Sequence, residues 1–593
     1  GSSSVSFRYN NLAYATTYTL NIPSGYVTDR SGNNAPAIES TFTVMERNKP
    51  AARVFNAIVD GSLEASIAPS ADAIGQYKTI QEAINAVPSD NAAPWLIFVK
   101  EGYYNDLNHL SFPTGKYSNG TDGSTDASED SRIVLVNKPF VHLIGQDVNK
   151  VTIAQDRVSG SAATYPDMPW YNVAEGATLV VTANDFYCEN ITIDNEWWTK
   201  KKEEGPQALA LYVEAGRAVF NNCRIRSYQD TYLSSKTGNQ NSGNQQPHFY
   251  DRQFMNNCFI EGAVDFIYGG GDVYFDNCTL NIVRENGGYI VAPCHYADLK
   301  DQGGNVTEVR TRYGYVFKNT TITAPAGKEA TTQVYFGRPW QNAPKTVFID
   351  TECRIKTYDG LWYYRMGAIP AIFAVYNMYD ANGYPMNTTS IEDYEYTDNG
   401  TVVKGKAKNS LTDEEAAAYT MTAVFEGDKS DAVTGYWNPA PMVEKTSVPT
   451  IGSTKGSTTF SWEADPYAIC YVVTVNGKVA GFTTETSYTA NLNDIVSVQS
   501  VNEFGALSEP SANFTVGGGS SSVSEVADAH ITIDGNRGYI SVRGIEEATV
   551  VEVYNLAGAL VESMKVSRNI SIAMPAGNYL VKAGAASAKV VVR

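Results

Sequence analysis

The chain has 593 residues, 43% of them hydrophobic and 18% charged, and this composition excludes a wholly disordered protein. Its 64 acidic and 45 basic residues give a net charge of -19 at pH 7, which argues against sequence-independent nucleic-acid binding and against attraction to anionic lipid. No apolar run approaches the roughly 18–20 residues of a membrane span. At about 100–200 residues per domain, the length predicts three to five domains, or one large domain with satellites.

The N-terminal residues 1–47 carry two short β-rich stretches, Tyr18–Pro23 and Thr28–Asn33. They resemble the last strands of a bacterial immunoglobulin-like module but are too short for a complete sandwich. The first residues also lack the charged and apolar regions of a signal peptide. Either the chain is cytosolic or its true start is missing, and the truncated module favours a missing start.

One helix and one strand are predicted next. Thr79 and Glu82 form a capping box, apolar residues follow at helical spacing, and Pro88 marks the end of the helix. The apolar run 95–99 predicts a buried strand after it.

A β-rich unit then repeats at irregular spacings of 20 to 42 residues. Its copies begin at Glu189, Asn221, Asn256, Asp276, Lys318 and Thr351, each with an Asn in the second place except the last, which has Glu352. This pattern predicts a parallel β-helix with loops of varying length. The Asn column is expected to form hydrogen bonds along the stack. The Cys beside it is expected to be a small buried hydrophobe, although a disulfide between Cys223 and Cys258 would also fit.

The repeat also predicts a pair of carboxylates. Asp230 follows Asn222 by eight residues, and Asp265 follows Asn257 by eight residues. The two aspartates should therefore lie in one column of adjacent coils, about 5 Å apart. Two carboxyl groups so close cannot both ionise freely, so their pKa values should split and give one acid and one base or nucleophile.

Beyond residue 440 the sequence changes character. Residues 445–516 alternate short strands with turns and resemble a fibronectin type III sandwich, 517–525 read as a Gly/Ser linker, and 526–593 form a last small β unit. That last unit resembles the C-terminal sorting domain of the type IX secretion route of Gram-negative bacteria. The resemblance implies type IX secretion machinery as a partner and a secreted or cell-surface location.

Four blocks of residues 50–440 resemble, in order, the signature blocks of pectin methylesterases. The blocks are Gln207–Leu211, Tyr228–Thr231, Gly262–Gly269 and Phe336–Trp340. The likeness implies an all-β fold, a right-handed parallel β-helix with appended small β-sandwich modules. It also implies a carboxylic ester hydrolase that removes methyl esters from homogalacturonan and needs no cofactor or metal. One departure is Asn105, where the family usually has Glu.

The resemblance also implies residue roles. Asp265 would be the nucleophile, Asp230 the general acid and then base, and Arg338 the partner that orients Asp265. Gln207 would stabilise the oxyanion, with Gln229 in the same neighbourhood. Substrate-binding residues would be Trp340, Phe266 and Tyr228. Two polar insertions, 114–131 and 236–247, are expected to shape the groove.

Two rival interpretations remain open at this stage. A calcium-dependent pectate lyase would share the fold but use an arginine base. A non-catalytic carbohydrate-binding β-helix would share the groove, although it would not need both carboxylates, the Gln and the Arg. The absence of Cys-x-x-Cys and His-Glu-x-x-His motifs argues against a structural zinc site or a zincin.

Overall fold

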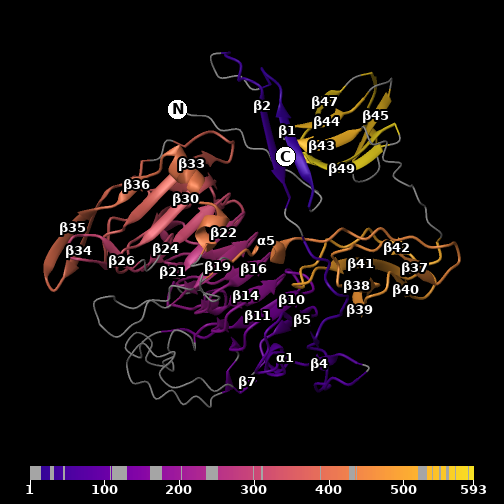
Figure 1. The fold of residues 1–593 in the computed structure, drawn as a ribbon, viewed down its shortest axis with the longest axis horizontal. Helices are drawn as coiled ribbons and strands as arrows, with labels where there is room; N and C mark the ends of the chain where they lie inside the picture. Colours follow the sequence, from indigo (N-terminus) through magenta and orange to yellow (C-terminus); the bar gives the residue numbers. More distant parts are fainter. Residues whose placement is uncertain are drawn as a thin grey trace.

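A computed structural model of the chain gives the architecture in Figure 1. It describes residues 15–26, 32–44, 47–71, 73–106, 108–109, 130–131, 133–159, 176–201, 204–235, 251–297, 299–308, 312–386, 389–426, 435, 437–518, 531–536, 538–545, 549–555, 560–567, 569–584 and 586–592. The insertion 236–247 lies outside the described residues, as do most of the insertion 114–131 and most of the linker 517–525.

A parallel β-helix occupies the centre of the chain, so the predicted fold class is confirmed. Most strands pair in parallel with the equivalent strand one coil away, which builds three long sheets. The first sheet contains β4 (Gly75–Tyr77), β3 (Ala57–Val59), β5 (Trp95–Val99), β10 (Val141–Gly145), β13 (Tyr187–Glu189), β16 (Ala218–Asn221), β19 (Arg252–Asn256), β22 (Asp272–Asp276), β27 (Tyr315–Lys318), β30 (Lys345–Cys353), β33 (Ile372–Asp380) and β36 (Lys408–Ser410). The second contains β6 (Gly102–Tyr104), β11 (Val151–Gln155), β14 (Thr192–Asn195), β17 (Arg224–Arg226), β20 (Phe259–Gly262), β23 (Thr279–Ile282) and β28 (Thr321–Thr323). The third contains β9 (Val134–Val136), β12 (Leu179–Val181), β15 (Leu211–Val213), β18 (Tyr232–Ser234), β21 (Ile267–Gly269), β24 (Asn286–Pro293), β29 (Gln333–Gly337) and β31 (Lys356–Thr357).

The corner between the first two sheets carries the predicted Asn column. Asn222 donates to Asn190 at 2.7 Å, and Asn257 donates to Asn222 at 3.2 Å. These residues have positive φ values near 50–57°, a conformation that Asn tolerates better than most residues. The column therefore joins adjacent coils through side-chain amides while the backbone turns the corner.

The predicted register of the last repeat is wrong by two residues. Lys318 pairs with Ile349, so Asp350 and not Glu352 follows Asn319 in the corner column. Asp350 has a φ of 54° and accepts a hydrogen bond from Asn377 of the next coil at 2.6 Å. Aspartate can take the same left-handed corner as Asn, so a pattern based on Asn did not mark Asp350.

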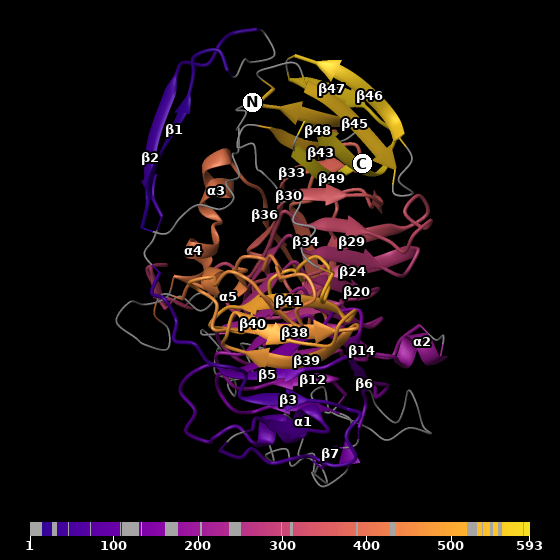
Figure 2. The ribbon, with the colours of Figure 1, turned by 90° about the vertical axis from the view of Figure 1, so that its right-hand side faces the viewer.

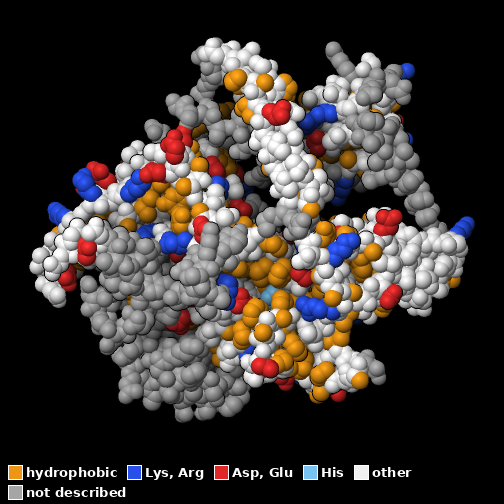
Figure 3. Space-filling model, in the orientation of Figure 1, with side chains coloured by type: hydrophobic (Ala, Val, Ile, Leu, Met, Phe, Trp, Pro, Cys, Tyr) orange, Lys and Arg blue, Asp and Glu red, His pale blue; other side chains and the backbone are white. Residues whose placement is uncertain are grey.

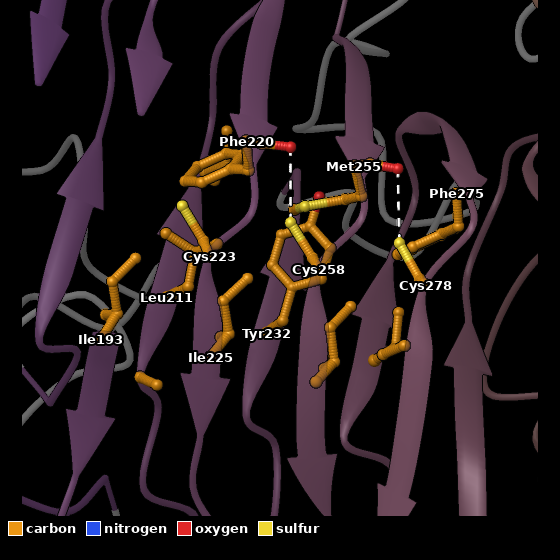
Figure 4. Packing of buried hydrophobic residues seen from close by; sticks show 14 of the residues in the cluster. Ile193, Leu211, Phe220, Cys223, Ile225, Tyr232, Met255, Cys258, Phe275 and Cys278 are labelled. Carbon is orange, nitrogen blue, oxygen red and sulfur yellow. Dashed lines mark hydrogen bonds between the residues drawn. The ribbon is translucent and has the colours of Figure 1, made fainter. Parts of the chain in front are cut away.

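The interior of the β-helix is apolar, and its cysteines pack as small hydrophobes. Cys223 and Cys258 are buried thiols and not a disulfide, which settles the alternative left open by the sequence. Figure 4 shows Cys258 and Cys278 among aliphatic and aromatic side chains, with their thiols donating to the carbonyls of Phe220 and Met255 at 3.4 Å. The weak thiol donors therefore find backbone acceptors inside the core.

Short elements cover the ends and edges of the β-helix. Helix α1 (Ile80–Asn85) begins at the predicted capping box, with Glu82 N–H donating to Thr79 at 3.2 Å. The other helices are α2 (Trp197–Lys201), α3 (Asp413–Ala418), α4 (Met421–Phe425) and α5 (Ala440–Val443). The edge strands are β7 (Asn108–His109), β8 (Asp130–Ser131), β25 (Leu299–Lys300), β26 (Val306–Glu308), β32 (Arg365–Met366), β34 (Asp393–Asp398) and β35 (Thr401–Lys406).

Two antiparallel sheets follow in residues 459–515. They contain β37 (Thr459–Ser461) with β40 (Ser487–Thr489), and β39 (Lys478–Thr483), β38 (Cys470–Val475), β41 (Ile495–Val501) and β42 (Phe514–Thr515). Figures 1 and 2 both place β38 and β39 beside β5 of the β-helix. Phe482 meets Phe55 and Phe98 with ring centroids 5.1 and 4.9 Å apart, and these side chains share one apolar cluster.

Polar contacts reinforce this junction. His142 contacts the Phe504 carbonyl at 2.8 Å, and Leu507 N–H donates to Glu189 at 3.3 Å. Burial raises the pKa of Glu189 to about 7. The segment 459–515 is thus docked on the β-helix through a shared core, which the sequence did not reveal.

We expect Phe482→Ala to destabilise the β-helix as well as the docked sheets. Losing a partly buried Phe side chain should cost about 2–3 kcal/mol, below the range for a fully buried one. Calorimetry should show a single transition shifted to lower temperature. Phe259→Ala, which removes a half-buried ring elsewhere on the helix, is the matched control. A second transition that alone responds to Phe482→Ala would show that the two parts unfold independently.

The chain ends are also β structure. β1 (Thr17–Ile22) and β2 (Ile38–Thr43) form an antiparallel hairpin. Residues 531–592 contain β43 (Thr532–Asn536), β44 (Tyr539–Arg543), β45 (Thr549–Asn555), β46 (Leu560–Val566), β47 (Ile570–Ala573), β48 (Gly577–Ala583) and β49 (Ala586–Val592). These last strands enclose an apolar cluster drawn from this segment alone.

On the face of the molecule drawn in Figure 3, Lys and Arg side chains are interspersed with Asp and Glu side chains.

Candidate functional site

Asp230 and Asp265 lie one above the other, as the repeat predicted. Tyr232 pairs with Ile267 in β18 and β21, which places Asp230 opposite Asp265 two residues earlier, and Asp230 N–H donates to the Val264 carbonyl at 3.1 Å. Both aspartates stand at corners with φ values of 59° and 49°. The β-helix therefore fixes both carboxyl groups through the backbone, before any side-chain contact is made.

Arg338 holds one member of the pair. Its Nε and Nη2 donate to the two oxygens of Asp265 at 2.8 and 2.5 Å. This two-bond geometry fixes the plane of the carboxylate as well as its charge. Arg338 directly follows β29, two coils beyond β21, so the chain brings it to Asp265 from 73 residues away.

The two carboxyl groups differ in their electrostatics. Burial raises the pKa of Asp230 well above its usual range, and the neighbouring Asp265 raises it further. Burial also raises the pKa of Asp265, but the hydrogen bonds and charge of Arg338 oppose that rise. Asp230 is therefore the member that retains a proton, and Asp265 is the member that ionises first.

Two glutamines adjoin the aspartate column. Gln207 pairs with Gln229 on the next coil, and Gln229 pairs with Val264 on the coil after that. Gln207 is exposed, while Gln229 is half-buried and its hydrogen bond to Asp230 opposes the rise in that residue's pKa. The sequence-predicted Gln207, Gln229, Asp230, Asp265 and Arg338 therefore meet in one place.

The aromatic residues of the site differ from the prediction. Phe266 is 0% exposed and belongs to the interior core, so its proposed place in a substrate groove is wrong. The outward side chain of this strand is Tyr268, which contacts Trp340 at a centroid distance of 5.7 Å. Tyr212 lies in the same outer cluster. The αL corner at Asp265 turns Phe266 and Ile267 inward, which simple counting from the corner could not show.

Trp340 and Tyr228 stand on different parts of the site. Trp340 is half-buried and lines a cavity of about 510 Å³ with Gln341 and Met366. Tyr228 is buried and stacks against Trp198 of α2 at 5.2 Å, so Trp198 covers it. Of the three predicted substrate contacts, Trp340 has the open position.

The described residues contain neither a metal-binding cluster nor a membrane-spanning helix. No group of three or more His, Cys, Asp or Glu side chains stands close enough to hold a metal ion in this part of the chain. Among the same residues, no helix has the length and apolarity to cross a membrane.

Among known proteins, the chain is similar to pectinesterases. The chain is 30% identical over 304 residues to a probable pectinesterase/pectinesterase inhibitor 58 of Arabidopsis thaliana, covering 49% of this chain and 42% of that protein. It is 29% identical over 284 residues to a pectinesterase of Petunia integrifolia, covering 47% of this chain and 60% of that protein. The chain thus spans about half the length of these relatives.

Solved structures give similar neighbours. The pectin methylesterase PemA of Erwinia chrysanthemi aligns with 65% of this chain and 99% of its own at 22% identity and a TM-score of 0.40. The pectin methylesterase of carrot aligns with 64% of this chain and 94% of its own at 20% identity and a TM-score of 0.40. The family model named Pectinesterase matches residues 129–428, which hold the whole candidate site. Because that match covers just over half of the sequence, the chain belongs to the pectinesterase family.

Proposed function

We propose that the protein hydrolyses the methyl esters of homogalacturonan and releases methanol. The observation that carries this proposal is the buried pair Asp230 and Asp265, of which only Asp265 is bound by Arg338. Such a pair supplies an ionised nucleophile beside a protonated acid, which ester hydrolysis without a serine or a metal requires.

In the first step a carboxylate oxygen of Asp265 attacks the ester carbonyl carbon. The carbonyl oxygen becomes an oxyanion, and we propose that the side-chain amides of Gln207 and Gln229, on coils next to the aspartates, stabilise it. The C–O bond to the methoxy group then breaks as Asp230 gives its proton to the departing oxygen. Methanol leaves, and the uronyl group remains joined to Asp265 as an anhydride.

In the second step Asp230, now ionised, takes a proton from water. The resulting hydroxide attacks the uronyl carbon, the bond to Asp265 breaks, and Asp265 leaves as a carboxylate. The product is the galacturonic acid residue, and Asp230 is again protonated. No oxidant, reductant or metal enters this balance.

An aromatic cluster beside the aspartates supports a role in sugar binding. Tyr268 and Trp340 meet beside the aspartate column, and Tyr212 lies in the same outward cluster. Aromatic faces pack against the apolar faces of pyranose rings, so this wall is suited to a polysaccharide chain. We propose the half-buried Trp340 as the substrate contact in place of Phe266, with the buried Tyr268 packed against it.

The geometry disfavours the lyase alternative. A lyase of the kind considered above would use a neutral arginine as its base. The hydrogen bonds from Arg338 to Asp265 stabilise the protonated guanidinium, and the pKa of Arg338 is raised despite burial, which acts to lower it. Arg338 is thus arranged to remain a cation.

Product analysis tests the proposed function. Highly methyl-esterified homogalacturonan is incubated with the protein, with and without EDTA, and both methanol and the ultraviolet absorbance of unsaturated uronides are measured. We expect methanol at equal rates in both samples and no rise in absorbance. Unsaturated uronides that disappear with EDTA would support the lyase, and binding without either product would support a carbohydrate-binding β-helix.

Gln207→Ala should lower methanol release by about a hundredfold, because it removes one oxyanion donor while others remain. The loss should fall on kcat more than on KM, since the amide acts on charge that develops in the transition state. Gln341→Ala, at a cavity-lining glutamine near Trp340, is the control for removing an amide close to the site. Equal losses in the two variants would contradict the assignment of Gln207.

We propose that the segments on either side of the β-helix serve export and location outside the cell. We propose residues 445–516 as a fibronectin type III-like module, 526–593 as a type IX sorting domain, and 1–47 as the end of an immunoglobulin-like module. The protein would then act outside a Gram-negative cell. The separate apolar cluster of the last segment supports its independence.

Truncation after Gly518 tests that division. Gly456 N–H donates to the Gly517 carbonyl at 2.9 Å, so the docked sheets need residue 517 and the cut must follow it. The truncated protein should keep wild-type kcat and melting temperature but should not be exported by the native host. A large loss of turnover in the purified truncated enzyme would show that residues 531–592 support the catalytic helix.

A further inference from the structure

The aspartate column continues into a ladder of tyrosines. Ile267 pairs with Val291, Tyr289 pairs with Tyr335, and Val334 pairs with Thr357 in the third sheet. Tyr289, Tyr335 and Tyr358 stack in one column, and Tyr289 lies close to Asp265, which is aligned with Asp230. β21, which begins two residues after Asp265, and β24, which contains Tyr289, lie in neighbouring coils (Figure 1).

Tyr289 contacts the face of the arginine that binds the proposed nucleophile. The Cζ atom of Arg338 lies 4.3 Å from the centroid of the Tyr289 ring, well within the range of a cation–π contact. The same guanidinium donates through Nε and Nη2 to Asp265. Arg338 is therefore held between a carboxylate and an aromatic face.

The ring of Tyr289 is itself held in place. It stacks on Tyr335 at 5.5 Å with an interplanar angle of 10°, and Tyr335 stacks on Tyr358 at 4.1 Å with the same angle. Tyr363 meets the edges of Tyr289 and Tyr335 at 5.7 and 5.5 Å. A ring packed on one face and one edge has little freedom to turn, so its other face stays directed at Arg338.

We propose that Tyr289 is a positioning residue, which holds the Arg338 guanidinium in the plane that binds both oxygens of Asp265. This inference rests on the proposed function, because it assigns Tyr289 a part in preparing the nucleophile. Tyr289 acts through Arg338 and does not contact the reacting atoms. Tyr335, Tyr358 and Tyr363 serve to brace it.

The surrounding charges agree with this role. Arg338 and Asp230 are the charged groups that face Asp265, and Arg338 and Asp265 are those that face Tyr289. Burial raises the pKa of Tyr289, so its ring remains neutral and presents an uncharged π face to the cation. If the ring is removed, Arg338 loses one of its two supports and its hold on Asp265 weakens.

The test compares Tyr289→Leu with Tyr289→Phe. Leu removes the π face, so kcat should fall about tenfold with KM changed less than about twofold, and the acidic limb of the kcat/KM profile should move to higher pH. Phe keeps the ring, so its kcat should stay within about threefold of wild type. Tyr467→Leu is the matched control, because the Tyr467 ring lies 4.9 Å from Arg47, which is itself paired with Glu503 far from the site.

A titration separates this inference from the proposed function. The pKa of the Asp265 carboxyl group is followed by carbon NMR in the folded, selectively labelled proteins, without substrate. Tyr289→Leu should raise that pKa by several tenths of a unit, and Tyr467→Leu should leave it unchanged. The titration needs no substrate, so its result does not depend on which ester the enzyme cleaves. If the wild-type protein released no methanol, the proposed function would be rejected, but the role of Tyr289 would not be.

Three outcomes would overturn the inference. An unchanged Asp265 pKa in folded Tyr289→Leu would show that Arg338 needs no aromatic support. A raised KM with unchanged kcat would make the ring a sugar-binding platform. A loss in Tyr289→Phe as large as that in Tyr289→Leu would assign the effect to the hydroxyl group and not to the ring.

Discussion

Asp265→Asn should lower kcat by about three orders of magnitude or more, because an amide cannot form the acyl intermediate. The substitution keeps the size of the side chain, and Asn accepts the left-handed corner at residue 265 as readily as Asp does. Arg338 can still donate to the remaining oxygen. The protein should therefore fold, melt near the wild-type temperature and bind methyl-esterified homogalacturonan.

The measurement is the initial rate of methanol release at saturating substrate, together with the melting temperature and substrate binding. Asp276→Asn, which alters the half-buried aspartate at the end of β22, opposite Asn256 of the preceding coil, is the control for a carboxylate lost from the stack. Near wild-type methanol release by Asp265→Asn would mean that another group is the nucleophile.

Arg338→Ala should also damage catalysis strongly. It leaves the buried Asp265 without the cation that orients and ionises it, and breaking such a buried pair also costs about 3–5 kcal/mol of folding stability. Because a misplaced reacting group alone can cost about a hundredfold, we expect kcat/KM to fall by about two orders of magnitude or more. Arg338 favours the charged form of Asp265, so its removal lets burial raise the pKa of Asp265 further. Less of the nucleophile is then ionised at any given pH.

The acidic limb of the kcat/KM profile of Arg338→Ala should accordingly move to higher pH. Arg338→Lys keeps the positive charge but not the paired hydrogen bonds. Its acidic limb should therefore lie close to the wild-type pH, while its kcat/KM should stay well below the wild-type value. An acidic limb at the wild-type pH in Arg338→Ala would show that Arg338 does not control the ionisation of Asp265.

The sequence predicted the β-helix and the aspartate column because both follow from a repeat. Asn at a left-handed corner recurs for a backbone reason, and a fixed offset from it carries Asp230 and Asp265 to the same height on adjacent coils. The repeat misplaced its last copy because Asp350 can serve the same corner as Asn. An offset counted from the repeat therefore predicts the register only in copies that have Asn at the corner.

The repeat could not predict which way the aromatic side chains of the site point. Phe266 stands beside Asp265 in the sequence, but the turn at the corner sends it into the core and leaves Tyr268 on the outward face of the sheet, buried against Trp340. Tyr289 had no motif to mark it, since its contact with Arg338 depends on the register between coils. The docking of residues 459–515 likewise depends on Phe482 meeting rings that are hundreds of residues away in the chain.

The double variant Asp230→Asn with Asp265→Asn tests the central claim most directly, namely that the two aspartates of one column act as a single chemical unit. Its kcat for methanol release is compared with that of each single variant under the same conditions. Either substitution alone already disables the pair of aspartates, so we expect a very low kcat in each single variant. The kcat of the double variant should be close to that of the less active single variant. Losses that multiply in the double variant would show that Asp230 and Asp265 act independently, and would contradict the mechanism.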